Sequence, residues 1–447
     1  MVVHGHGSQM MTLVWLPWVI FTIFKLYNEV SLLNIALLGF TVGLQLQRAH
    51  VQIAYYTWLA AGLFILFLFF QRQKANIEKT KWILSVSAGL LLGLLMAMWI
   101  YLPALNYTPY SIRGAGTGGG AGIEYATAWS FSMGEMSTFL IPSYFGFGGP
   151  TYWGNMPFTD YPNYMGILVL TLALIGVILH NNKLKYYFGT AALIAILLSF
   201  GKHFFLYGLF YDYFPMFNKF RVPVMLLVIT QFSTCVLAGF GLDVIINDVK
   251  NVQKINSEKI LIGIFSMIIL AIIFLNLSLD EDAFGAKNHP ILNPLRMEMV
   301  SYDTMTVCIL LILSAILSYC YQNGFISKLL FTGSLIILSV FDLYSIDRQI
   351  IEPSPELFRS PTLSKRSFIS PYLRTDEVIT FLTNDKGKYR ILPLGSLGNE
   401  NRFSAFHIES VAGYHPAKLF RYNEVINKVG WSSKGVLQML NVKYLVS

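Results

Sequence analysis

Hydrophobic runs of nearly bilayer length recur along the first three quarters of the chain, and they constrain its fold more than any other feature. A helix needs roughly 20 apolar residues to cross the hydrocarbon layer. Ten runs approach that length, at 10–24, 30–46, 51–70, 82–105, 164–179, 186–200, 222–246, 260–279, 304–321 and 325–341. Charged residues form 13% of the chain, against roughly 25% in soluble domains. We therefore predict an α-helical polytopic membrane protein with about ten transmembrane helices spanning residues 1–342.

The distribution of Lys and Arg predicts the orientation, because these residues accumulate in short cytoplasmic loops. The connections 25–29, 71–81, 180–185, 247–259 and 322–328 hold 11 Lys/Arg in 42 residues. The alternate connections 47–50, 106–163, 201–221 and 280–303 hold 7 in 107. This bias predicts that both termini and the large loop 106–163 lie on the outer face. No cytosolic domain is then left to bind ATP or NAD.

Gly114, Gly116 and Gly119 match the G-x-G-x-x-G pattern of dinucleotide-binding loops. That fingerprint requires a strand before it and a helix after it within a βαβ unit, whereas here the glycines lie in an outer loop between two predicted spans. We expect either a cradle for a lipid-borne phosphate, since glycines let backbone N–H groups approach an anion, or a plain mobile loop.

The rest of loop 106–163 combines many aromatic side chains with a few acids, of which Glu124 and Asp160 are the candidate catalytic residues. Aromatic faces beside carboxylates suit a sugar, whose C–H face stacks and whose hydroxyls need acceptors. The alternative is an aromatic belt that only anchors the loop. Residues 126–139 are predicted to form a helix in the membrane interface.

Cations near the predicted outer boundary form a second candidate site. Lys219 and Arg221 precede the span 222–246, and Arg113 is the only Lys/Arg of loop 106–163. These side chains can bind a lipid phosphate, with the Arg fork making bidentate contact. Alternatively, Lys219 and Arg221 only extend to lipid headgroups.

Polar residues also gather at a tight outer bend between two spans, where Gln45, Arg48, His50 and Gln52 lie. Such residues are costly near the membrane unless paired or hydrated, so we expect them to line a central cavity and Arg48 and His50 to contact substrate. The alternative is a structural hydrogen-bond network that links helices.

The chain becomes more polar after residue 342, which predicts a linker at 343–375 and a small extracytoplasmic α/β domain at 376–447. Helices are expected at DEVITFLTND and AKLFRYNEVINKV and strands at KYRILPL and VKYLV. His415, Lys418 and Arg421 lie around a predicted helix start, where Lys418 and Arg421 would share a face suited to an anion or acidic glycan. The alternative is that this face is only solvated.

The sequence gives no signal for a disulfide framework, a metal site or nucleic-acid binding. Cys235, Cys308 and Cys320 fall in or near apolar runs and show no disulfide or zinc-ligand spacing. His4 and His6 have no identified partner ligands, so no metal site is predicted, although a divalent cation stays open as a cofactor. The net charge of +8 suits anionic lipid, and nothing indicates nucleic-acid binding.

Long motifs distributed over nearly the whole chain resemble the YfhO family of bacterial multi-pass membrane proteins. They are GHGSQMMTLVWLPW, LQRAHVQIAYYTWL, EYATAWSFSMGEMSTFLIPSYFGFGG, YWGNMPFTDYPNYMGI, NKFRVPVMLL, ESVAGYHPAKLFRY and LQMLNVKYLV. The resemblance implies a GT-C glycosyltransferase architecture in the bacterial cytoplasmic membrane. Such a protein moves a sugar from a polyprenyl-phosphate donor to an extracytoplasmic cell-envelope acceptor, and some relatives are linked to lipoteichoic acid glycosylation.

The start of the chain resembles an interior part of that family, so the resemblance implies truncation at the N-terminus, with loss of the usual catalytic acid, and at the C-terminus as well. If the chain is such a fragment, the resemblance implies that it is inactive by itself; otherwise Glu124 and Asp160 are the remaining candidate acids for catalysis. Two other functions stay open: a lipid-linked sugar flippase or exporter, and a noncatalytic envelope assembly protein.

Overall fold

The computed structural model describes residues 7–71, 76–112, 122–247, 254–353, 373–399, 402–413 and 418–447, and within these ranges it is mostly helical. Six helical stretches are long and apolar enough to cross a membrane: Gly7–Asn28, Val51–Gln71, Ile77–Tyr110, Pro223–Asn247, Leu292–Gln322 and Lys328–Ile351. Four shorter apolar helices are Leu32–Gln47, Ile167–Leu179, Leu184–Ser199 and Ile262–Leu277. Every predicted apolar run therefore coincides with a helix, and the chain is a helical membrane protein.

The chain divides into two compact units, and the division differs from the predicted domain boundaries. Unit 1 comprises Met1–Met98 and Ala121–Thr362, and unit 2 comprises Trp99–Gly120 and Leu363–Ser447. The last part of helix α5 (Asn76–Tyr107) thus groups with the C-terminal module. Helix α13 (Lys328–Ile351) also extends into the predicted linker at 343–375, because residues 343–351 contain no glycine or proline and the first proline after them is Pro353.

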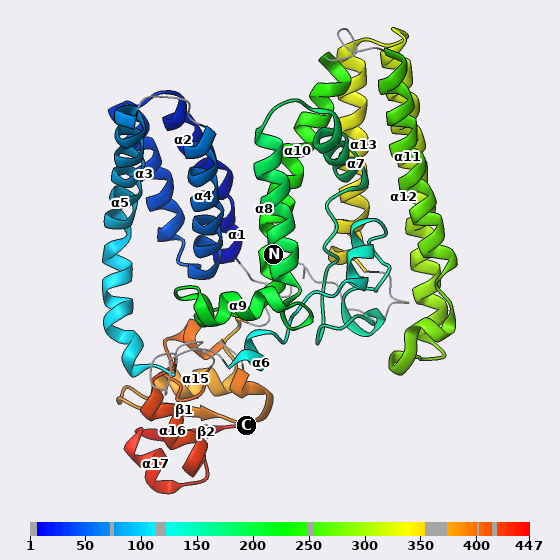
Figure 1. Cartoon of the computed structure of the whole chain (residues 1–447). Coiled ribbons are helices and arrows are strands. Elements are labelled where there is room, and N and C mark those ends of the chain that lie inside the picture. Colours follow the sequence, from blue (N-terminus) through cyan, green and yellow to red (C-terminus); the bar gives the residue numbers. More distant parts are fainter. Residues whose placement is uncertain are drawn as a thin grey trace. The chain divides into compact units, whose positions relative to one another are not determined.

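The first helices of unit 1 are α1 (Gly7–Leu13), α2 (Leu16–Asn28), α3 (Leu32–Gln47) and α4 (Val51–Gln71), which pack together (Figure 1). Ser31 begins α3 by accepting a hydrogen bond from the Asn34 backbone N–H. Helix α5 approaches α3 through glycine: a Cβ on Gly93 would lie 2.6 Å from the Val42 side chain. Small residues at such interfaces let helices in a membrane pack closely.

A second group of helices in unit 1 contains α7 (Ile167–Leu179), α8 (Leu184–Ser199), α10 (Leu227–Asn247), α11 (Lys254–Leu277), α12 (Leu292–Gln322) and α13 (Figure 1). Helix α10 packs against both α7 and α8. Glycines bring the backbones of α7 and α10 into contact, since a Cβ on Gly241 would lie 1.9 Å from the Leu172 carbonyl oxygen.

The segment 122–166 of unit 1 is irregular, and the helix predicted at 126–139 is wrong. Helix α6 (Ile123–Ala126) ends after one turn, and a 3-10 turn, η2 (Gly134–Phe139), follows after a gap. Serine side chains bond locally here, where Ser132 Oγ donates to Glu135 Oε2 at 2.9 Å, and such bonds compete with a continuous helix.

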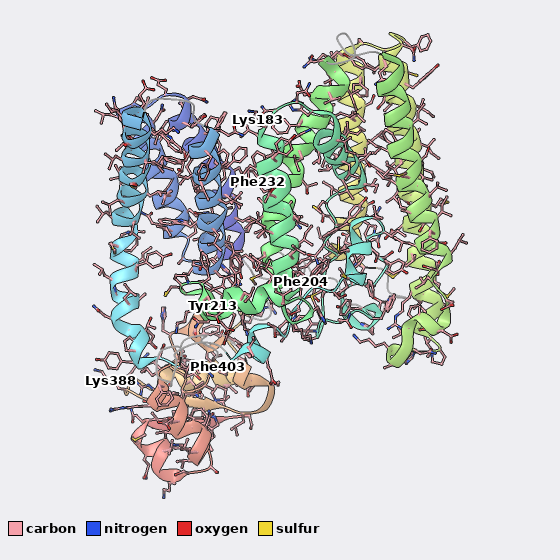
Figure 2. All side chains as sticks on the ribbon, in the orientation of Figure 1. Lys183, Phe204, Tyr213, Phe232, Lys388 and Phe403 are labelled. Carbon is pink, nitrogen blue, oxygen red and sulfur yellow. The ribbon has the colours of Figure 1, made fainter. Side chains whose placement is uncertain are left out.

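The C-terminal module of unit 2 has the predicted α/β elements. Strands β1 (Arg390–Pro393) and β2 (Val442–Val446) pair in parallel in a two-stranded sheet. Helices α15 (Glu377–Asn384), α16 (Phe420–Val429) and α17 (Lys434–Met439) accompany them, and Figure 2 marks Phe403 in this module. Its apolar core contains Ile379, Leu382, Ile391, Phe403, Ile408 and Val446.

Candidate functional site

Arg221 lies in a junction of three segments that are distant in the sequence. Its guanidinium donates a hydrogen bond to the Tyr125 hydroxyl and lies over the Tyr125 ring, 5.1 Å from the centroid. Its carbonyl oxygen accepts a hydrogen bond from Gln52 Nε2 at the start of α4. A guanidinium carries five N–H donors, so Arg221 keeps donors for a ligand. The cation predicted at the membrane boundary is thus held at a defined place.

The backbone on either side of this cation is strained. Met216 has φ of 66° and Val222 has φ of 63°, a region that a β-branched residue such as valine rarely adopts. The Val222 N–H donates to the Ala126 carbonyl at 2.9 Å, and the Val224 N–H donates to the Trp129 carbonyl. These bonds hold the strained segment against α6 and the turn after it. Strained positions of this kind cluster at functional sites.

An apolar groove of about 340 Å³ lies between α4, α8, α10 and the short helix α9 (Phe205–Tyr213). Its lining residues are almost all apolar: Trp58, Leu59, Ala60, Gly62, Leu63, Leu66, Ala191, Ile194, Ala195, Leu198, Phe210, Phe214, Leu226 and Ile229. The buried Trp58 Nε1 has no hydrogen-bond partner within the described parts of the chain. The volume and apolar lining suit a hydrocarbon chain.

Arg221 lies beside the start of α4. The groove begins further along this helix, at Trp58. Gln52, which bonds the Arg221 carbonyl, precedes Trp58 by six residues, which corresponds to about 9 Å along the helix axis. Between them, Tyr55 Oη donates to the Pro215 carbonyl at 2.6 Å, and the Tyr55 and Phe220 rings lie 4.9 Å apart. The segment carrying Arg221 is therefore fixed beside one end of the groove.

Further basic residues follow the groove-lining part of α8. Lys202 and His203 come directly after this helix and are exposed, and the exposed Lys219 ends the turn η5 (Phe217–Lys219). Burial lowers the pKa of His203, and the positive charge of Lys202 lowers it further. His203 is therefore neutral near pH 7. Figure 2 shows Lys183 and Phe204 at opposite ends of α8, which places Lys183 away from this group.

The two candidate acids lie in segments that meet the Arg221 junction. Glu124 is exposed on α6, next to Tyr125. Asp160 is half-buried and follows Phe158, whose ring contacts Trp129 edge-on with 5.4 Å between centroids. Trp129 in turn bonds the backbone of residue 224. Both acids thus lie on segments that are linked to the Arg221 junction through neighbouring residues.

In the polar bend at 45–52, Gln45 and His50 make hydrogen bonds that support the helices, as expected for the alternative of a structural network. The buried Gln45 Nε2 donates to Thr57 Oγ1 at 2.9 Å and to the Thr12 carbonyl at 3.3 Å, joining three helices. His50 Nδ1 accepts from the Ile53 backbone N–H at 3.3 Å and so caps the start of α4. Arg48 is exposed after the end of α3. The expectation that Gln45 lines a central cavity is wrong.

Other predicted residues lie elsewhere in the chain. Arg113, the Gly114 to Gly119 motif, His4, His6 and His415 fall outside the described residues. Lys418 and Arg421 belong to unit 2 and do not share a helical face, because α16 begins only at Phe420. The Lys418 carbonyl instead accepts a hydrogen bond from the Ile112 N–H at 2.9 Å. The described residues contain no group of three or more His, Cys, Asp or Glu that could hold a metal ion.

Buried charged residues that hold the loop 122–166 in place were missed at the sequence level. Asp342 Oδ1 accepts from Tyr164 Oη, and its Oδ2 accepts from the Ile167 N–H, both at 2.8 Å. Asp303 Oδ2 accepts from the Ser143 N–H at 3.0 Å. Ionisable residues inside apolar helices are a known signal, but Asp303 and Asp342 directly flank the predicted spans 304–321 and 325–341. The sequence pattern therefore does not mark them as ionisable residues inside a span.

A third buried acid, Glu135, is 1% exposed and organises the middle of the loop. It accepts hydrogen bonds from Tyr152 Oη at 2.5 Å and from the Ser132 N–H at 2.9 Å. Burial and the adjacent Glu135 charge raise the pKa of Tyr152, so the tyrosine stays a hydrogen-bond donor. Lys287 lies over the Tyr152 ring, 4.9 Å from its centroid, and donates to the Gly154 carbonyl at 2.7 Å.

We expect Arg296→Met to destabilise the loop strongly. Arg296 is 3% exposed, and its guanidinium donates to the carbonyls of Thr151 at 3.0 Å, Lys287 at 2.7 Å and Pro150 at 3.2 Å. Methionine would leave these oxygens without a donor, which costs about 3 kcal/mol in total. The measurement is the temperature at which the detergent-solubilised chain loses its monodisperse chromatographic peak. Arg296→Lys should fall between wild type and Arg296→Met, and wild-type behaviour of Arg296→Met would contradict this role.

Comparison of the chain with protein-family models, with curated proteins and with solved structures gave no match in any of the three.

Proposed function

We propose that this protein is a membrane glycosyltransferase of the GT-C type, which moves a sugar from polyprenyl phosphate to a cell-envelope acceptor outside the bacterial cytoplasmic membrane. All ten apolar helices cross the bilayer in this proposal, and the loop 122–166, the Arg221 junction and the C-terminal module lie on the outer face. One observation carries the proposal: the segment that carries Arg221 is held beside one end of a groove suited to a hydrocarbon chain. The motifs that resemble the YfhO family support the same function.

The parts of a polyprenyl-phosphate sugar match the apolar groove, the basic residues and the aromatic segments, in that order. Its isoprenoid chain would lie between α4 and α8, against residues such as Gly62 and Ala195. Its phosphate would accept hydrogen bonds from Arg221, with Lys219 and Lys202 adding positive charge. The aromatic segments near Trp129 and Phe158 provide faces for the sugar.

The proposed reaction is an inverting transfer. The acceptor hydroxyl oxygen forms a bond to the anomeric carbon while the bond from that carbon to the phosphate oxygen breaks. Asp160 or Glu124 takes the hydroxyl proton as general base. Arg221 stabilises the negative charge that develops on the departing lipid phosphate. Arg48, Arg113, His415, Lys418 and Arg421 have no step in this reaction.

Arg221→Ala should reduce sugar transfer about 100-fold, because the cation opposite the leaving phosphate is lost. The assay uses the full chain in proteoliposomes, radiolabelled polyprenyl-phosphate hexose and an envelope fraction as acceptor. Lys183→Ala removes an exposed cation at the far end of α8 and should act as wild type. Asp160→Asn tests the base in the same assay.

The same assay separates the proposal from its rivals. A flippase or exporter would move the labelled lipid across the bilayer without transferring its sugar. A noncatalytic assembly protein would do neither. Equal transfer by wild type and Arg221→Ala would contradict the proposed role of this cation.

A further inference from the structure

A second cleft, of about 520 Å³, lies between α12 and α13 and is separate from the groove on α4 and α8. Three charged side chains line it, Glu298 on α12 and Arg348 and Glu352 at the end of α13. All three are exposed. Among the described residues, none of these side chains forms a hydrogen bond or ion pair with another protein group. The cleft therefore presents one unpaired cation beside two unpaired carboxylates.

The rest of the lining is mostly apolar or aromatic, with Ser345 and Gln349 as its uncharged polar residues. Leu295, Met299 and Phe341 line it together with Tyr302 and Tyr344. Phe341 is 54% exposed and Tyr344 is 61% exposed, so this face of the hairpin has no protein cover in the described structure. Phe341 precedes Arg348 by seven residues, which corresponds to about 10 Å along α13. The lining thus changes from apolar to charged toward the end of the helix.

The hairpin that carries the cleft has the exposed apolar surface of a helix pair in contact with lipid. Ile309 and Ile316 on α12 and Ile336 and Val340 on α13 are each at least 48% exposed. A cleft that continues this surface and ends in charged groups has the same order of polarity as a phospholipid, in which acyl chains lead to a charged headgroup.

We propose that this cleft binds a phospholipid whose zwitterionic headgroup carries a primary ammonium, as in phosphatidylethanolamine. The phosphate accepts hydrogen bonds from the Arg348 guanidinium. The ammonium donates to the carboxylates of Glu298 and Glu352, and the acyl chains lie along Phe341 and its neighbours. This binding does not depend on the proposed transferase activity.

The charges that line the cleft determine which phospholipid headgroup it should prefer. Two carboxylates and one guanidinium give a net charge of −1, which opposes an anionic headgroup such as phosphatidylglycerol. A choline headgroup has the required charges but no N–H donors, so it cannot form the charge-assisted hydrogen bonds with the carboxylates. The cleft should therefore prefer phosphatidylethanolamine to both.

The test is native mass spectrometry of the full chain in detergent, with phosphatidylethanolamine, phosphatidylglycerol or phosphatidylcholine of the same acyl chains added. We expect the ethanolamine lipid to be retained about fivefold more than either of the others. Glu298→Gln combined with Glu352→Gln should abolish this preference, and Arg348→Met should lower retention of all three lipids. Asp282→Asn, an exposed acid outside the cleft, should leave the preference unchanged.

Two results would overturn the proposal: equal retention of the three lipids by the wild-type chain, or an unchanged ethanolamine preference in the double glutamine variant. The replaced side chains are exposed, so each variant should keep the wild-type chromatographic profile. A variant without that profile would show that the charges support the fold, which also contradicts a purely ligand-binding role.

Discussion

Gly241→Leu is expected to prevent the chain from folding, and even Gly241→Ala should be destabilising. The Cβ of either residue would lie 1.9 Å from the Leu172 carbonyl oxygen on α7, well inside van der Waals contact. Gly176 on α7 faces the same interface, where its Cβ would lie 2.2 Å from the Leu237 carbonyl oxygen. Because both obstacles are backbone atoms, no side-chain rotation relieves the clash. The helices must separate, at a cost of more than about 3 kcal/mol for leucine.

Gly239 on the same helix is the matched control, since a Cβ there meets nothing within 4 Å. Gly239→Ala should raise stability by up to about 1 kcal/mol, because alanine has the higher helix propensity. Gly241→Ala should change stability in the opposite direction. The yield of monodisperse protein and its thermal midpoint measure both effects. Equal behaviour of the two alanine variants would show that α7 and α10 do not meet at this glycine.

The helices could be predicted from the sequence because apolar runs of bilayer length have few alternatives to helix. The irregular structure of the loop 122–166 could not be predicted in this way. The segment 126–139 looked amphipathic, yet its serines and Glu135 bond within the loop, with Ser132 and Glu135 as the central pair. These local bonds decide against a continuous helix.

The candidate site was predictable in part. Lys219 and Arg221 stood out because they precede an apolar run, and the structure places Arg221 against Tyr125 and Gln52. The sequence does not indicate that Tyr125 and Arg221 are in contact, because this contact depends on how two distant segments pack in three dimensions. Arg296 and Asp342 were missed for the same reason. Their partners Thr151 and Tyr164 lie in a loop whose path the sequence does not specify.

Gly62→Phe should abolish the binding of polyprenyl phosphate. Gly62 lines the apolar groove, and a Cβ at this position meets nothing within 4 Å. A phenyl ring can therefore enter the groove without straining the backbone, and it would take the place of the isoprenoid chain. Gly189→Phe on α8 is the matched control, because a Cβ at Gly189 also meets nothing within 4 Å and this residue does not line the groove.

The decisive measurement is the retention of radiolabelled polyprenyl phosphate by the purified full chain and by these two variants. Our account predicts saturable retention by the wild type and by Gly189→Phe, with only background retention by Gly62→Phe. Wild-type retention by Gly62→Phe would contradict the assignment of the groove on α4 and α8 to the lipid chain.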